Sequence, residues 1–197
     1  MTFAVELYTS PRMAASLRGV VKIIQKAFGI CLSHETIRLW VLQASLKKLP
    51  RGFSTETWHI DETYVKVKGM GHWLWIVRCR ESGDVIAWHL SKTHLLKDAI
   101  LLLRKSKDNC NGFLPEKIIT DGLWHYPVAI YKVMGWNWKE HKERHVVDSG
   151  IGKNAFIERL NKEIKRRIKW FGSFQALAGA NAFFGLWFYH HNTQYLT

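Results

Sequence analysis

Cysteine is scarce in this sequence, and its three copies fall into no recognisable pattern. Cys31, Cys79 and Cys110 are odd in number and widely spaced, and no Cys-x-x-Cys pair occurs. A disulfide framework or a zinc ribbon needs paired or closely spaced cysteines. The pattern argues against both and predicts three reduced thiols in a protein of a reducing compartment.

Long apolar segments are missing as well. The first six residues lack the basic start and the apolar stretch of a secretory signal. The longest run without charge or histidine spans residues 171–189, and Ser173, Gln175 and Asn181 interrupt it. Such a run predicts a core helix rather than a membrane span, which needs about 20 mostly apolar residues. We therefore expect a cytoplasmic protein.

Acidic residues are few compared with basic ones. The 16 Asp and Glu face 29 Lys and Arg, which gives a net charge of +13 and a pI of about 9.8. Such an excess attracts polyanions, and the usual partner is nucleic acid or an anionic membrane surface. The composition favours nucleic acid, and the 47% of hydrophobic residues is normal for a protein that buries a core.

Two helices are predicted before a basic, proline- and glycine-containing linker at 47–52. Apolar residues recur at helical spacing from Leu17 to Phe28, and Gly29 supplies a stop. Ser33 then offers an N-cap for a second helix. This outline is that of a helix-turn-helix, and we divide the chain into a DNA-binding segment at 1–50 and a larger domain at 51–197.

In a helix-turn-helix the second helix enters the major groove by its N-terminal end. His34, Thr36 and Arg38 stand there, and we expect them to contact DNA. The alternative is a plain helical hairpin that packs on the larger domain. The surplus of basic residues in this segment favours DNA binding.

Beyond the linker the pattern becomes that of a mixed α/β fold. Strands are predicted at 58–67, 73–77, 85–90 and 118–120, with a further strand near 136–138, and helices at 95–103, at 124–134 and through most of the remainder. Three successive strands, a helix, another strand and more helices indicate a mixed sheet that is covered by helices.

Two aspartates stand out by their positions on the predicted strands. Asp61 lies inside an apolar strand, where a buried carboxylate is costly unless something such as a metal ion compensates it. Asp121 follows the short strand 118–120, and Gly122 lets the chain turn away. Carboxylates at strand ends point into the crevice where ligands usually bind.

A third acid, Glu158, lies at the edge of the apolar stripe of a long helix. Asn161 and Lys165, three and seven residues later, share its face. An acid, an amide and a base on one helix edge suit a metal ion and a phosphate together. Magnesium prefers oxygen ligands, and two ions about 4 Å apart can stabilise both oxygens of an in-line phosphoryl displacement.

Each acid also has a purely structural explanation. Asp121 is compatible with a turn residue or a helix cap, Glu158 with a solvated charge beside Arg159, and Asp61 or Glu62 with a lysine partner. Three such coincidences in one basic chain are less frequent than any one of them. His141 and His145, at helical spacing, suggest zinc only weakly, because no cysteine or metalloprotease pattern accompanies them.

Taken in order, these motifs resemble those of the DDE transposases, the RNase H-like enzymes of insertion sequences and retroviral integrases. The matching segments are Trp58-x-x-Asp61-Glu62-Thr63, Pro115-x-x-Ile118-Ile119-Thr120-Asp121-Gly122, Asn154-x-x-Ile157-Glu158-Arg159 with Lys165, and Ser33-His34-Glu35-Thr36-Ile37-Arg38-x-Trp40. The resemblance covers residues 14 to 195 and includes the family's usual spacing between the second and third acids.

The resemblance implies an RNase H-like domain in which Asp61, Asp121 and Glu158 bind two Mg²⁺ or Mn²⁺ ions. It implies cleavage of DNA at element ends and strand transfer into target DNA, by a homo-oligomer assembled on terminal inverted repeats in a prokaryotic nucleoid. We expect further DNA contacts from Asn161, Lys162, Lys165 and Lys169. The alternatives are an RNase H-like nuclease that does not join DNA, and a truncated or domesticated DNA-binding protein without catalysis.

Overall fold

The computed structural model describes the chain except for residues 14, 46–55, 149–154 and 194–197. It divides into two compact units, a helical unit (Met1–Pro50, Lys66–Met70 and Glu163–Thr197) and a sheet unit (Arg51–Val65 and Gly71–Lys162). The residues from Glu163 onward therefore belong to the same unit as the N-terminal helices. The domain boundary at residue 50 that we expected from the sequence stays a proposal. The linker expected at 47–52 lies outside the described residues.

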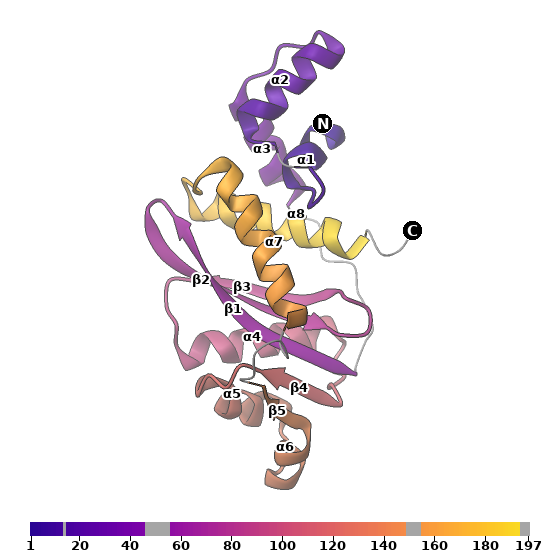
Figure 1. Ribbon diagram of the computed structural model, residues 1–197, viewed down its shortest axis with the longest axis vertical. Coiled ribbons are helices and arrows are strands. Elements are labelled where there is room, and N and C mark those ends of the chain that lie inside the picture. Colours follow the sequence, from indigo (N-terminus) through magenta and orange to yellow (C-terminus); the bar gives the residue numbers. More distant parts are fainter. Residues whose placement is uncertain (14, 46–55, 149–154, 194–197) are drawn as a thin grey trace. The chain divides into compact units, whose positions relative to one another are not determined.

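A five-stranded mixed sheet confirms the fold class expected from the sequence. Its strands are β1 (Thr57–Val67), β2 (Met70–Cys79), β3 (Val85–Ser91), β4 (Lys117–Thr120) and β5 (His145–Val147). They lie in the order β3-β2-β1-β4-β5 (Figure 1). β4 is parallel to both β1 and β5, whereas β2 and β3 are antiparallel to each other. The strand that contains Asp61 therefore lies beside the strand that ends just before Asp121.

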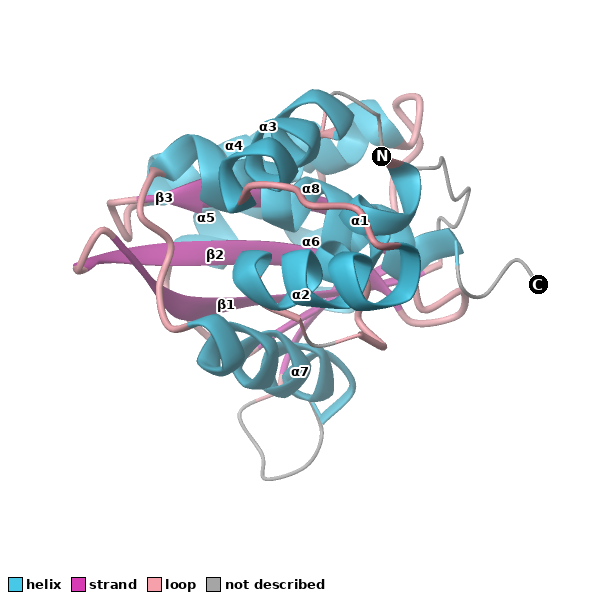
Figure 2. Cartoon of the chain, turned by 90° about the horizontal axis from the view of Figure 1, so that it is seen from above, coloured by secondary structure: helices cyan, strands magenta, loops and turns pink. Residues whose placement is uncertain are grey.

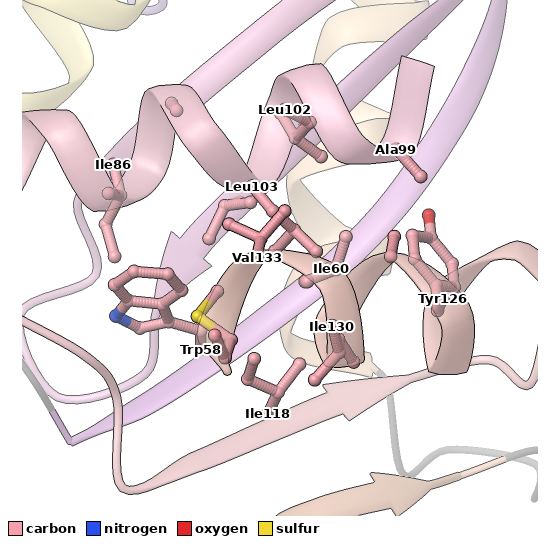
Figure 3. Close-up of a cluster of buried hydrophobic side chains, with 14 of the residues drawn as sticks. Trp58, Ile60, Ile86, Ala99, Leu102, Leu103, Ile118, Tyr126, Ile130 and Val133 are labelled. Atoms are coloured by element: carbon pink, nitrogen blue, oxygen red, sulfur yellow. The ribbon is translucent and has the colours of Figure 1, made fainter. Parts of the chain in front are cut away.

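One face of the sheet is covered by α4 (Leu96–Asn109) and α5 (His125–Met134). Trp58 and Ile60 of β1 are completely buried on this face, among side chains such as Leu102 of α4 and Ile130 of α5 (Figure 3). Because side chains alternate along a strand, His59 and Asp61 point to the opposite face. Burial of this cluster fixes which way each residue of β1 faces.

The opposite face receives the beginning of α7 (Ala155–Phe171). The ring of Phe156 lies 5.3 Å from that of His59, and the guanidinium carbon of Arg78 lies 3.9 Å above it. Arg78 Nη1 also donates a hydrogen bond of 2.9 Å to the carbonyl oxygen of Phe156. These contacts hold the first turn of α7 against the sheet on the side of Asp61.

The prediction of a strand near 136–138 is wrong. Asn137 instead caps α6 (Trp138–Arg144): its side chain accepts a hydrogen bond from the backbone N–H of Glu140, whose carboxylate accepts one from the backbone N–H of Asn137. This reciprocal capping box favours a helix over an extended strand. The fifth strand follows that helix, at 145–147.

The helical unit contains α1 (Thr2–Thr9), α2 (Leu17–Phe28), α3 (His34–Ala44) and α8 (Leu177–Thr193), drawn in cyan in Figure 2. Ser33 accepts a hydrogen bond of 3.0 Å from the backbone N–H of Thr36, and Gly29 ends α2 in the left-handed region (φ 68°). These are the cap and the stop expected for a helix-turn-helix. No helix in the described part of the chain is long and apolar enough to cross a membrane.

Two side chains of this unit lie where the sequence pattern does not put them. Phe28, expected on the buried stripe of α2, is 60% exposed, because it is the last residue of the helix. Arg167, one of the cations that follow Glu158 on α7, is buried. It donates hydrogen bonds to the carbonyl oxygens of Tyr8 and Ala15, and its guanidinium carbon lies 5.2 Å from the ring centre of Phe171.

Candidate active site

Asp61 is held by the strand on which it lies and by α7. Its Oδ1 accepts a hydrogen bond of 2.9 Å from the backbone N–H of Glu62. Its Oδ2 accepts one of 2.7 Å from the side-chain amide of Asn161, which lies three residues after Glu158 on α7. The carboxylate is thus oriented from both sides and keeps lone pairs for a further partner.

Asp121 reaches the same place from the end of β4. Gly122 turns the chain with a positive φ of 95°, and a Cβ atom at this position would lie only 2.8 Å from Cγ1 of Val147. The backbone N–H of Leu123 donates a hydrogen bond of 3.0 Å to Asp121 Oδ1. The tight turn therefore depends on glycine and fixes the direction of the exposed aspartate.

Glu62 is a third carboxylate at this site, and the sequence did not reveal its role. Oxygens of Asp61, Glu62 and Asp121, one from each, lie within 4.8 Å of one another. The hydroxyl of Tyr126 donates to Glu62 Oε2, and Nε2 of His94 lies 3.0 Å from Oε1. Both oxygens of Glu62 are therefore engaged, and alternation on β1 points its side chain to the face covered by α5, which contains Tyr126.

The electrostatics of this cluster disfavour three negative charges. Burial, together with the neighbouring carboxylates of Glu62 and Asp121, raises the pKa of Asp61 to about 7 against the effect of its two hydrogen bonds. Burial and Glu62 likewise raise the pKa of Tyr126 well above its usual value. A cation among the oxygens would relieve this repulsion.

Glu158 lies on the first turns of α7 and is exposed. Among the described residues, the carboxylate group within 4.8 Å comprises Asp61, Glu62 and Asp121 without it. Asn161, one turn later on the same helix, touches Asp61 directly. The structure thus brings Asp61 and Asp121 together. It also places α7, the helix that contains Glu158, in contact with Asp61 through Asn161.

The predicted DNA contacts differ in how accessible they are. His34, Lys162, Lys165 and Lys169 are exposed, whereas Asn161 is only 6% exposed and its amide is engaged with Asp61. Arg38 donates two hydrogen bonds to Glu35, and the hydroxyl of Thr36 lies 2.9 Å from that of Ser33. Asn161 is the least available of these residues for a phosphate or a base.

The histidine pair considered as a zinc site is engaged in a different way. Nδ1 of His145 lies 3.2 Å from Nε2 of His141, and Nε2 of His145 lies 2.9 Å from the hydroxyl of Thr120. Burial, with a smaller contribution from His141, lowers the pKa of His145 to about 4. A neutral imidazole that links β5 to β4 accounts for these contacts.

Comparison with known proteins finds a matching family and two similar proteins. A family model described as a DDE domain matches residues 55–186. The chain is 28% identical over 185 residues to the transposase for insertion sequence element IS257 in transposon Tn4003 of Staphylococcus aureus. It is 27% identical to the transposase for insertion sequence-like element IS431mec of the same species. Each alignment covers 85% of this chain and 73% of the relative.

A solved structure has a similar fold. A chain of the simian T-cell lymphotropic virus intasome, in complex with PP2A regulatory subunit B56 gamma, superposes with a TM-score of 0.50 at 20% identity. The match covers 71% of this chain and 50% of the viral chain. At this identity the likeness concerns the fold alone.

Proposed function

Because this chain belongs to the DDE-type insertion-sequence transposases, enzymes that cleave and join DNA, we propose that it cuts element ends and joins them to target DNA at Asp61, Asp121 and Glu158. The observation that carries this proposal is the convergence of Asp61 and Asp121 from neighbouring strands, with Asn161 of α7 hydrogen-bonded to Asp61. That convergence is what a shared metal site requires.

The donor set fits hard divalent cations such as Mg²⁺ or Mn²⁺. Carboxylate oxygens within 4.8 Å of one another, with the pKa of Asp61 raised to about 7, make a site that a cation would stabilise. Asp61, Asp121 and Glu158 would hold two such ions. When bound, they supply charge stabilisation for the attacking and the leaving oxygen of a phosphodiester.

The chain's own residues position these ligands. The backbone N–H of Glu62 and the amide of Asn161 fix the plane of the Asp61 carboxylate, and the N–H of Leu123 fixes Asp121. Such preorganisation limits the reorganisation needed during the reaction. Glu158, on the α7 edge that contains Asn161, would complete the site when DNA and metal are bound.

The DNA is proposed to be held by two sets of residues. His34, Thr36 and Arg38 at the beginning of α3 would read the terminal repeats, and the exposed Lys162, Lys165 and Lys169 would contact phosphates. We further propose that the active form is a homo-oligomer that pairs two element ends, acting on the nucleoid of a prokaryotic cell.

Joining of DNA distinguishes this proposal from its two alternatives. The purified chain, given Mg²⁺ or Mn²⁺ and duplexes copied from the DNA that flanks its coding sequence, should produce both nicked ends and strands covalently joined to a plasmid. Chelation of the metal with EDTA should stop both products. Nicking without joining would indicate a nuclease, and binding without either product a non-catalytic DNA-binding protein.

Arg38→Ala should weaken binding to the element end by about 1–3 kcal/mol if Arg38 reads a base edge. To do so, the guanidinium must leave Glu35, with which it makes two hydrogen bonds of 2.8 and 2.5 Å. Binding to random DNA should change much less. Gel-shift titrations on both DNAs test this, with Lys26→Ala on the last turn of α2 as the control. Equal losses on both DNAs would reduce Arg38 to a phosphate contact.

A further inference from the structure

A continuous row of aromatic rings borders the carboxylate cluster. From Tyr64 it passes through Trp73, His94 and His125 to Trp124, with successive ring centroids 5.6, 4.1, 5.8 and 3.9 Å apart. Its two ends are open to solvent: Tyr64 is 46% and Trp124 is 66% exposed. All five residues belong to the sheet unit, as do the carboxylates.

The row is tied to the acidic residues by hydrogen bonds. Nε2 of His94 lies 3.0 Å from Glu62, and Nε2 of His125 lies 3.0 Å from the carbonyl oxygen of His94. At the other end, the Leu123 N–H that donates to Asp121 lies one residue before Trp124. These bonds hold the rings of His94 and His125, and the backbone just before Trp124, close to the carboxylates.

Trp124 is the most exposed residue of the row, so packing of the core does not account for its large aromatic side chain. Its indole leaves most of its large apolar surface in water, a cost that burial would remove at about 25 cal/mol per Å². Its ring centroid lies 3.9 Å from that of His125, at an interplanar angle of 46°, and His125 is itself only 4% exposed. An exposed aromatic ring beside a buried one is suited to stacking with another flat group.

We propose that Trp124 stacks on an unpaired base of the DNA strand held at the carboxylates. This inference rests on the proposed function, because it takes DNA as the occupant of the site. The net charge of +13 favours DNA over a neutral partner. Every base has a π face, so an aromatic platform accepts an unpaired base of any sequence.

The short connection to Asp121 limits which base this is. Three residues span at most about 11 Å, and a DNA strand advances about 3.4 Å per nucleotide. The stacked base thus belongs to a nucleotide close to the scissile phosphate. Inside a duplex, both faces of that base are covered by its neighbours, so it must be flipped or unpaired to reach the indole.

Two probes of equal charge separate stacking from attraction to phosphate. One is a fluorescein-labelled single strand of about 12 thymidine nucleotides, and the other has the same backbone with abasic sites throughout. Fluorescence anisotropy would give the affinity of the full chain for each. Trp124→Ala should weaken binding to the base-bearing strand about 5- to 100-fold, and to the abasic strand less than about 2-fold.

Two further variants make the result specific. Trp124→Phe keeps an aromatic face and should restore most of the affinity, whereas Trp138→Ala removes an indole that is 78% exposed on α6 and should change neither affinity. Equal losses on both probes, no loss, or the same loss for Trp138→Ala would overturn the proposal. Because this assay measures binding alone, its failure differs from a failure of the joining assay.

Discussion

Asp61→Asn should abolish DNA cleavage and joining while it stabilises the metal-free protein. The substitution removes a charged oxygen from the proposed metal site, and a bound ion supplies several kcal/mol of transition-state stabilisation. Activity should therefore fall about 10³-fold or more. Loss of charge from the crowded cluster of Asp61, Glu62 and Asp121 has the opposite effect on folding.

The sign of the stability change follows from the pKa of Asp61. Its folded-state pKa of about 7 lies above the unfolded value, so the folded protein binds the extra proton between about pH 4 and pH 7. The stability of the metal-free wild-type protein should fall as the pH rises through this window and level off above it. The Asp61→Asn variant has an uncharged amide in place of the carboxyl group, so it should lack that fall.

Urea denaturation in EDTA at pH 5 and pH 8 measures this effect. At pH 8 the variant should be more stable than the wild type by about 1–3 kcal/mol, since the substitution loses one acceptor but removes the repulsion. Asp108→Asn, an exposed acid on α4, is the matched control and should change neither stability nor activity. A wild-type stability that is flat from pH 5 to pH 8 would contradict the electrostatic reasoning.

The positions of Asp61 and Asp121 could be predicted because local patterns determine them. An acid within an apolar strand, and another where a short apolar strand meets Gly122, place both residues on the sheet without knowledge of distant contacts. The order of the strands then decides that they meet, and the parallel pairing of β1 with β4 brings them together.

Contacts between distant residues could not be predicted in the same way. Glu62 is held by His94 and Tyr126, which are 32 and 64 residues away in sequence. Arg167 donates to carbonyl groups more than 150 residues away, so its helical neighbours give no sign that it is buried. The three-residue strand β5 is too short for its periodicity to show.

The last prediction distinguishes Glu158 from Glu62 as the third metal-binding acid. Glu158→Gln should lower cleavage and joining about 10³-fold, because it removes a proposed ligand. It should leave the free energy of unfolding nearly unchanged, because the side chain is exposed. DNA affinity should stay the same or rise, because one negative charge near the phosphates is lost.

Glu62→Gln should have the opposite pattern, a larger loss of stability and a smaller loss of activity than Glu158→Gln. At pH 5, where Asp61 is protonated and little repulsion is relieved, Tyr126 and His94 would lose a charged hydrogen-bond acceptor in a buried setting, which costs about 1–3 kcal/mol of stability. Activity should fall only about 10- to 100-fold, the effect typical of residues that lie just outside the metal ligands. Metal-dependent cleavage rates and urea denaturation of the two variants decide the matter. If Glu62→Gln were the more severe for activity and Glu158→Gln nearly neutral, the three carboxylates that already converge would be the metal ligands, and α7 would contribute only Asn161.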